Sequence, residues 1–250
     1  MNTLKVILLI STLSGLLVIA GYLLGRGTGM VIALLLSALM NLGSYWFSDS
    51  IVLKMYNARP VTQAEAPALY NAVEALAGKA EIPVPKLYII PSDTPNAFAT
   101  GRNEDHAAVA VTSGLLSLMS EAEIRGVLAH ELSHIKHKDI LISTMAATIA
   151  GAVVLLSRWS VFFSGDEGGV VSAVAVAIVA PVAATLVQMA ISRSREYEAD
   201  AGSAGITGNP EALADALRKL SGLAKIKPLG ANPATAHMFE KLMAMKSGLT

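Results

Sequence analysis

Four long apolar segments constrain the fold of this chain more than any other feature, because such segments have to be kept out of water along most of their length. They span residues 6–24, 30–47, 140–156 and 170–191. The first two contain no charged residue, and each is about long enough to cross a bilayer core of roughly 30 Å. We therefore predict an integral membrane protein with about four transmembrane helices.

Two other interpretations of these segments stay open. The first segment has the general form of a cleaved signal peptide, although Lys5 gives only a weak positive region and a second apolar segment follows at once. The last two segments could pack as a buried helical hairpin in a soluble core. Composition favours the membrane, because 53% of the residues are hydrophobic and only 15% are charged.

Basic residues near the predicted membrane ends indicate the orientation. With four spans, the N-terminus, residues 49–139 and residues 192–250 share one side of the bilayer. That side carries more lysine and arginine near the spans than the opposite loops, which offer Arg26 and Arg158. The basic residues on the richer side are Lys54, Arg59, Lys136, Lys138, Arg193 and Arg195. By the positive-inside rule, we expect the large polar parts to face the cytoplasm.

Charge and cysteine content exclude several classes of function. The formal net charge is zero, so we expect no bulk attraction to a polyanion and no nucleic-acid partner. The chain has no cysteine, so His, Asp and Glu have to supply the ligands of any metal. A transporter or channel is disfavoured, because the predicted spans carry almost no ionisable residue.

The predicted spans divide the chain into four parts. Residues 1–48 form two N-terminal transmembrane helices, and residues 140–191 form a transmembrane hairpin. Residues 49–139 and 192–250 are two cytoplasmic parts that together make a catalytic domain. We predict an α+β, mainly helical fold, with a small sheet that precedes a helix rich in histidine.

Three sequence signals predict where helices begin in the polar parts. Thr-x-x-Glu at residues 62–65 is a capping box that opens a helix to about residue 78. Ser-x-x-Glu at residues 120–123 is a second capping box, and it opens the helix that carries the histidines. Asn-Pro at residues 209–210 supplies an N-cap and a first-turn proline for a helix to about residue 220.

The sequence His130-Glu131-Leu132-Ser133-His134 carries the chemistry. On a helix, residues i and i+4 lie on one face, so both imidazoles can reach a single zinc ion. Glu131 is placed between them to take a proton from a water molecule that the metal activates. The motif therefore predicts a metal-dependent hydrolase.

A third ligand is needed, because catalytic zinc sites have three protein ligands and leave the fourth position to water. The best candidate is Glu196, and Asp200 lies one helical turn further on. Asp200 can then accept the free ring N–H of a ligand histidine and fix its tautomer. Glu198 competes for the ligand role, but on a helix it points to a different face from Glu196.

Three further histidines lie outside the motif. His137 could touch the same face as His134 but is expected near the membrane interface, and His106 is expected in a surface loop. His237 has no assigned place. An oxyanion donor is also required, and the candidates are Tyr197, His237 or an arginine.

A short sheet is predicted ahead of the metal-binding helix. The strands lie at Lys86–Ile90 and at residues 107–111, and the stretch with Asn96, Ala97, Phe98 and Ala99 lies between them and ends in a glycine at residue 101. This intervening stretch reads equally well as an edge strand that pairs with an extended substrate and as a surface loop.

The metal site is expected close to the bilayer. The third apolar segment begins six residues after His134, and the fourth ends five residues before Glu196. If both ligand helices continue into the spans, a rise of about 1.5 Å per residue places the metal within roughly 10–15 Å of the bilayer surface.

Several motifs together resemble the HtpX-like heat-shock membrane zinc metalloproteases, which are related to the CAAX prenyl endopeptidases. The matching residues are 47–49 leading to 52–56, then 95–101, 130–134, 194–204 and 232–239. The resemblance implies a gluzincin-type protease of the inner membrane that degrades misfolded or damaged membrane proteins. It implies His130, His134 and Glu196 as zinc ligands, and Glu131 as the general base.

The same resemblance implies that Asn96, Ala97, Phe98 and Ala99 line the substrate cleft. Members of this family continue past residue 239 into a further segment, whereas this chain runs on to Thr250 and stops. This departure motivates an alternative function, a non-catalytic membrane scaffold or adaptor that keeps zinc for its stability.

Overall fold

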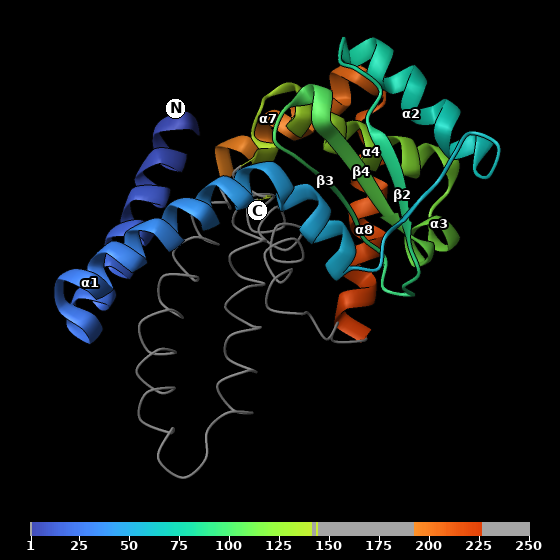
Figure 1. Cartoon of the computed structure of the whole chain (residues 1–250). Helices are drawn as coiled ribbons and strands as arrows, with labels where there is room; N and C mark the ends of the chain where they lie inside the picture. Colours follow the sequence, from blue (N-terminus) through green and yellow to red (C-terminus); the bar gives the residue numbers. More distant parts are fainter. Residues whose placement is uncertain (1, 142–143, 145–192, 227–250) are drawn as a thin grey trace.

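The computed structural model of the chain describes residues 2–141, residue 144 and residues 193–226 (Figure 1). The apolar segments at residues 140–156 and 170–191 lie almost entirely outside this part, as does the tail with His237. Among the described residues, no helix is long and apolar enough to cross a membrane. The number of spans, their sidedness and the four-part division of the chain stay predictions.

Helix α1 spans Asn2–Met55, where the sequence predicts two separate helices. Arg26 lies between the two predicted helices and has a φ of 50°, which is the left-handed region. Figure 1 shows α1 changing direction sharply along its length, so that its last part runs along the sheet. The end of α1 contacts β3 and β4 there.

A four-stranded sheet precedes the helix that carries the histidines, as predicted. Its strands are β1 (Arg59–Pro60), β2 (Lys86–Ile90), β3 (Ala97–Gly101) and β4 (Ala107–Thr112), in the order β1-β2-β4-β3. β2 and β4 are parallel, and the other two pairs are antiparallel. β2 has the predicted bounds, β4 runs one residue further than predicted, and β1 was not predicted. β3 lies at one edge, which excludes the surface-loop interpretation of this stretch.

Six helical elements complete the described fold besides α1. They are α2 (Pro67–Ala80), the short 3₁₀ turn η1 (Glu104–His106), α3 (Ser113–Leu118), α4 (Glu121–Lys136), α7 (Arg193–Thr207) and α8 (Pro210–Ile226). α4 begins with the predicted capping box, in which Ser120 accepts the Glu123 N–H and Glu123 accepts the Ser120 N–H. Asn209 caps α8 through the Ala212 N–H, and α8 continues beyond its predicted end.

The predicted helix start at Thr62 is wrong, because α2 begins at Pro67. The Glu65 carboxylate does accept the backbone N–H of Thr62 at 2.7 Å and its hydroxyl at 2.8 Å. The Glu65 N–H, however, binds the Thr62 carbonyl at 3.2 Å, so the pair closes a tight turn instead of capping a helix. Pro67 starts the helix because its fixed φ suits the first helical position.

The sheet is buried on both faces, which fixes its position relative to α4. Val109 and Val111 of β4 belong to the larger core cluster, which also contains Leu128 of α4. Ala108 and Ala110 belong to a second cluster with residues from the end of α1. Successive residues of a strand point to opposite faces, so β4 joins both clusters. α4 in turn contacts α2, α7, α8 and β3, and therefore lies at the centre of the polar domain.

Candidate metal centre

α4 brings its two histidines together on one buried face. His130 and His134 are 7% and 6% exposed, and their Nε2 atoms lie 3.2 Å apart. The spacing of four residues in an α-helix produces this arrangement, as the sequence predicts.

α7 supplies the third group. Glu196 Oε2 lies 3.6 Å from His130 Nε2 and 3.8 Å from His134 Nε2. Around a tetrahedral zinc ion, ligand atoms at about 2.0–2.1 Å from the metal are about 3.3 Å from one another. The three observed separations are close to that value, so these side chains can hold one metal ion.

A close approach of α4 and α7 makes this convergence possible. A Cβ atom at Gly202 of α7 would overlap the side chain of Ser133 on α4. Ser203 of α7 donates a buried hydrogen bond of 2.9 Å to the Gly126 carbonyl on the same helix α4. The small residues after Glu196 therefore let the two ligand helices touch.

The competing polar residues do not join the cluster. Glu198 is exposed, and Tyr197 is 60% exposed. His106 is exposed and contacts Asn103 at 2.7 Å, as expected of a loop residue. His137 is exposed, and its Nδ1 contacts Ser133 at 3.2 Å instead of pointing to the cluster.

Each cluster histidine has a carboxylate at its other ring nitrogen. Asp200 Oδ1 lies 2.9 Å from His130 Nδ1, which is the contact that the spacing of Glu196 and Asp200 predicts. Asp139 Oδ2 lies 3.0 Å from His134 Nδ1, and the sequence analysis missed this residue. Asp139 follows the end of α4, so helical periodicity gives no signal for it. Only the left-handed turn at Lys138, with a φ of 58°, directs the chain back towards His134.

Glu131 connects the cluster to the edge strand. Its Oε2 accepts the backbone N–H of Ala99 at 2.9 Å, and the residue is 8% exposed. On the same strand, the Phe98 side chain is buried on the face of the sheet opposite that of Ala99, and its ring centroid lies 5.3 Å from that of Tyr56. Asn96 is also buried, and its N–H binds Thr112 at 2.8 Å. Any contact between β3 and a substrate would therefore be made mainly by backbone atoms.

A buried arginine lies beside the cluster. Arg195 is 7% exposed, and burial lowers the pKa of its guanidinium. The carboxylates of Asp139, Glu196 and Glu198 oppose this shift and favour the charged form. The cation thus balances part of the negative charge that the cluster collects.

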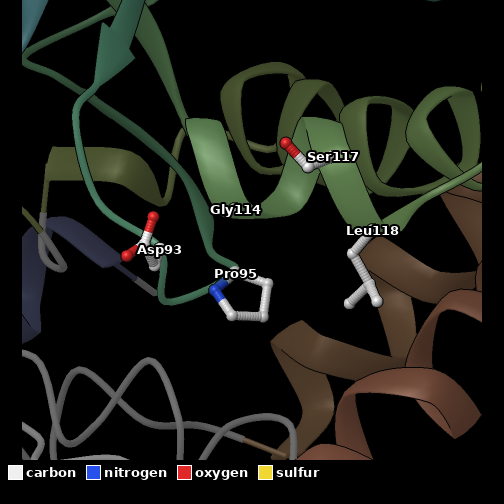
Figure 2. Close-up of a pocket in the computed structure, with 5 residues that line it drawn as sticks. All are labelled: Asp93, Pro95, Gly114, Ser117 and Leu118. Atoms are coloured by element: carbon white, nitrogen blue, oxygen red, sulfur yellow. The ribbon is translucent and has the colours of Figure 1, made fainter.

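A shallow pocket of about 290 Å³ is lined by a different set of residues (Figure 2). It is formed by the loop before β3 and by α3, and its lining residues are Asp93, Pro95, Gly114, Ser117 and Leu118. None of these residues belongs to the cluster. The candidate metal centre is therefore the converging side chains of α4 and α7 and not this hollow.

Comparisons with known proteins agree with the geometry. The chain matches Peptidase family M48 over residues 63–246. A "Protease HtpX homolog" from Desulforapulum autotrophicum is 54% identical over 248 residues, which covers 95% of this chain and 80% of that protein. A protein of the same name from Ralstonia nicotianae is 51% identical over 245 residues, with coverage of 95% and 86%.

The fold is also found in a solved structure. The crystal structure of S. mikatae Ste24p matches with a TM-score of 0.55 and 18% sequence identity. The match covers 100% of this chain and 65% of that one. At this identity the likeness concerns the fold alone, whereas the family match covers most of the chain. The chain belongs to peptidase family M48 and is a metalloprotease related to the HtpX proteases.

Proposed function

We propose that the chain is a zinc-dependent endopeptidase whose reaction takes place at the cluster on α4 and α7. His130, His134 and Glu196 hold one zinc ion per chain, Glu131 is the general base, and Asp200 orients His130. The observation that carries this proposal is the triangle of ligand atoms, with separations of 3.2, 3.6 and 3.8 Å, next to a buried glutamate.

The donor set suits zinc. Two imidazole nitrogens and one carboxylate oxygen, with a fourth position open to water, are typical of catalytic zinc sites. Magnesium and calcium prefer sites built from oxygen atoms alone. When bound, zinc supplies a Lewis acid that polarises a carbonyl group and acidifies a water molecule.

Glu131 moves the proton. Its carboxylate takes a proton from the attacking water and delivers it to the leaving amine. The hydrogen bond from the Ala99 N–H holds one carboxylate oxygen of Glu131 in place, and this contact also limits the orientation of the second oxygen. Burial of Glu131 keeps bulk water away from this transfer.

The edge of β3 that faces away from β4 supplies a place for the substrate backbone. The N–H of Ala99 binds Glu131 and the N–H of Gly101 binds Thr144, so both point away from β4. Ala97 lies two residues before Ala99, and strand geometry directs its N–H and carbonyl to the same edge. An extended polypeptide that pairs with Ala97 is thereby led to Glu131 and the metal.

The substrates are proposed to be misfolded or damaged membrane proteins, cleaved on the cytoplasmic side of a bacterial inner membrane. The four apolar segments and the distribution of basic residues support this setting. The resemblance to the HtpX-like proteases supports a role in quality control of the cell envelope.

The test is cleavage of an unfolded model protein by the full chain, purified in detergent, with and without zinc. Glu131→Gln should abolish cleavage and leave zinc bound. Glu121→Gln is the matched control, because Glu121 lies on the same helix and its side chain is 85% exposed. Cleavage by Glu131→Gln at the unmodified rate would contradict the proposal. Bound zinc with no turnover in the unmodified chain would support a scaffold instead.

A further inference from the structure

The two cluster histidines differ in how their second ring nitrogens are held. Asp139 places both carboxylate oxygens near His134 Nδ1, at 3.0 and 3.2 Å. Asp200 places one oxygen, at 2.9 Å from His130 Nδ1. The Asp139 side chain is 5% exposed and the Asp200 side chain is 31% exposed. The Asp139 side chain as a whole is therefore the better shielded from water, although the Asp200 Oδ1 atom is also buried. A carboxylate whose two oxygens are both kept out of water holds an imidazole N–H more strongly.

The turn that carries Asp139 is held at several points. The Asp139 N–H donates to the His134 carbonyl at 3.2 Å, so backbone and side chain of Asp139 both contact the same residue. Lys138 takes a left-handed φ of 58°, and its Nζ lies 3.0 Å from Glu104 Oε1 of η1. The turn therefore contacts η1 as well as α4, and the buried contacts to α4 are the ones that hold it, since the Lys138 side chain is 74% exposed.

From this geometry we infer that Asp139 is a positioning residue for the metal site, and that it contributes more to zinc affinity than Asp200 does. Asp139 accepts the Nδ1–H of His134, which leaves the Nε2 lone pair of that ring directed at the metal. The inference rests on the proposed function, since it assumes that His134 is a zinc ligand.

Arg195 supports the role of Asp139. Arg195 is buried beside the cluster. Of the carboxylates that act on its charge, Asp139 is the one that is buried and is not a proposed zinc ligand. Asp139 therefore lies near both His134 and a buried cation.

The experiment measures the zinc dissociation constant of the full chain by competition with a chelator, for Asp139→Asn and Asp200→Asn. Loss of an outer partner of a zinc ligand lowers metal affinity by about 10–100-fold. We expect Asp139→Asn to fall in this range and Asp200→Asn to change the affinity by less than about 10-fold. Arg218→Gln is the control, because Arg218 forms only exposed ion pairs on α8.

Absorption of the cobalt-loaded chain separates positioning from a general loss of stability. A misdirected imidazole should change the visible bands of cobalt in Asp139→Asn, measured well below the unfolding temperature. If Asp139→Asn does not fold, Asp139→Glu takes its place, with the same expected weakening because the longer side chain no longer fits the turn.

Two results distinguish this inference from the proposed function. If the unmodified chain binds no zinc, the proposed function itself fails and the inference fails with it. The inference alone is overturned if the unmodified chain binds zinc and Asp139→Asn binds it equally well. It is also overturned if Asp139→Asn binds zinc more tightly than Asp200→Asn does.

Discussion

The two ends of helix α4 bury charged side chains in opposite ways. At the N-terminal end, the carboxylate of Glu123 is 5% exposed and lies 2.7 Å from Lys219 of α8. It also accepts the N–H and hydroxyl of Ser120, at 2.7 and 2.8 Å. In the C-terminal half, carboxylates and imidazoles converge on one point from α4 and α7. The first arrangement neutralises a charge within the protein, whereas the second collects lone pairs that suit a metal cation.

The two ends of α4 are therefore expected to have different roles, one in the stability of the fold and the other in metal binding. A carboxylate that is paired with a lysine and a helix cap contributes to the free energy of folding. A group of histidines and carboxylates that face one another is suited to bind a metal cation, and its close packing has to be supported by neighbouring contacts. Mutations at the two ends should therefore affect different measurements.

The largest expected effect is at Glu196. Glu196→Gln should weaken zinc binding by more than about 100-fold, because a direct ligand matters more than the outer partners whose loss costs 10–100-fold. Cleavage should be lost in parallel. Glu198→Gln is the matched control on the same helix, since Glu198 is exposed, and zinc titration should show it unchanged. Equal losses in both variants would remove the geometric argument for Glu196.

A smaller effect is expected where α4 and α7 touch. Gly202→Ala would place a Cβ atom against Ser133, and overpacking of this kind costs about 1–3 kcal/mol of the free energy of unfolding. The shift of α7 should also weaken zinc binding. Gly205→Ala is the control on the same helix, because a Cβ there meets nothing within 4 Å, and it should be neutral or stabilising. Denaturant unfolding with and without zinc measures both changes.

At the other end of α4, Lys219→Met should lower stability by about 1 kcal/mol or less and leave zinc binding unchanged. The hydrogen bonds from Lys219 and then Ser120 lower the pKa of Glu123 from 4.5 to about 2. Because the folded pKa is depressed, this contribution is present above pH 4.5 and is lost as the pH falls towards 2. Unfolding curves of the two proteins should therefore differ at pH 7 and approach each other near pH 2. A constant difference across this range would show that Glu123 is not the partner that matters.

The smallest effect is expected on the exposed face of α8. Arg218 pairs with Glu211 and Asp215, and these side chains are all more than half exposed. Solvent screens such pairs, so Arg218→Gln should leave the unfolding temperature, zinc binding and cleavage unchanged. A clear loss of zinc affinity in this variant would mean that charge far from the cluster also controls the site.

Sequence reasoning succeeded where one local rule determines the structure. The capping box at Ser120 and the spacing of His130 and His134 identify α4 and the face that carries the histidines. The strand at Lys86–Ile90 follows from its apolar residues between turn signals. The meeting of Glu196 with the histidines was predicted from chemistry, and the small residues of α7 make the required approach possible.

Sequence reasoning failed where a contact depends on the three-dimensional path of the chain. Asp139 reaches His134 only because α4 ends in a left-handed turn at Lys138. The contact of Glu131 with Ala99 joins residues 32 positions apart and depends on how the sheet packs on α4. Thr62 and Glu65 have the pattern of a capping box, yet their hydrogen bonds close a turn ahead of Pro67. The first two predicted spans lie within α1, whereas the last two lie almost entirely outside the described residues.

The most direct test of the account is a titration of metal-free protein with zinc while cleavage of an unfolded substrate is followed. We expect no cleavage without metal, a rise in proportion to added zinc, and a plateau at one zinc per chain. Cleavage by the metal-free chain, or a plateau that is unchanged in Glu196→Gln, would contradict it.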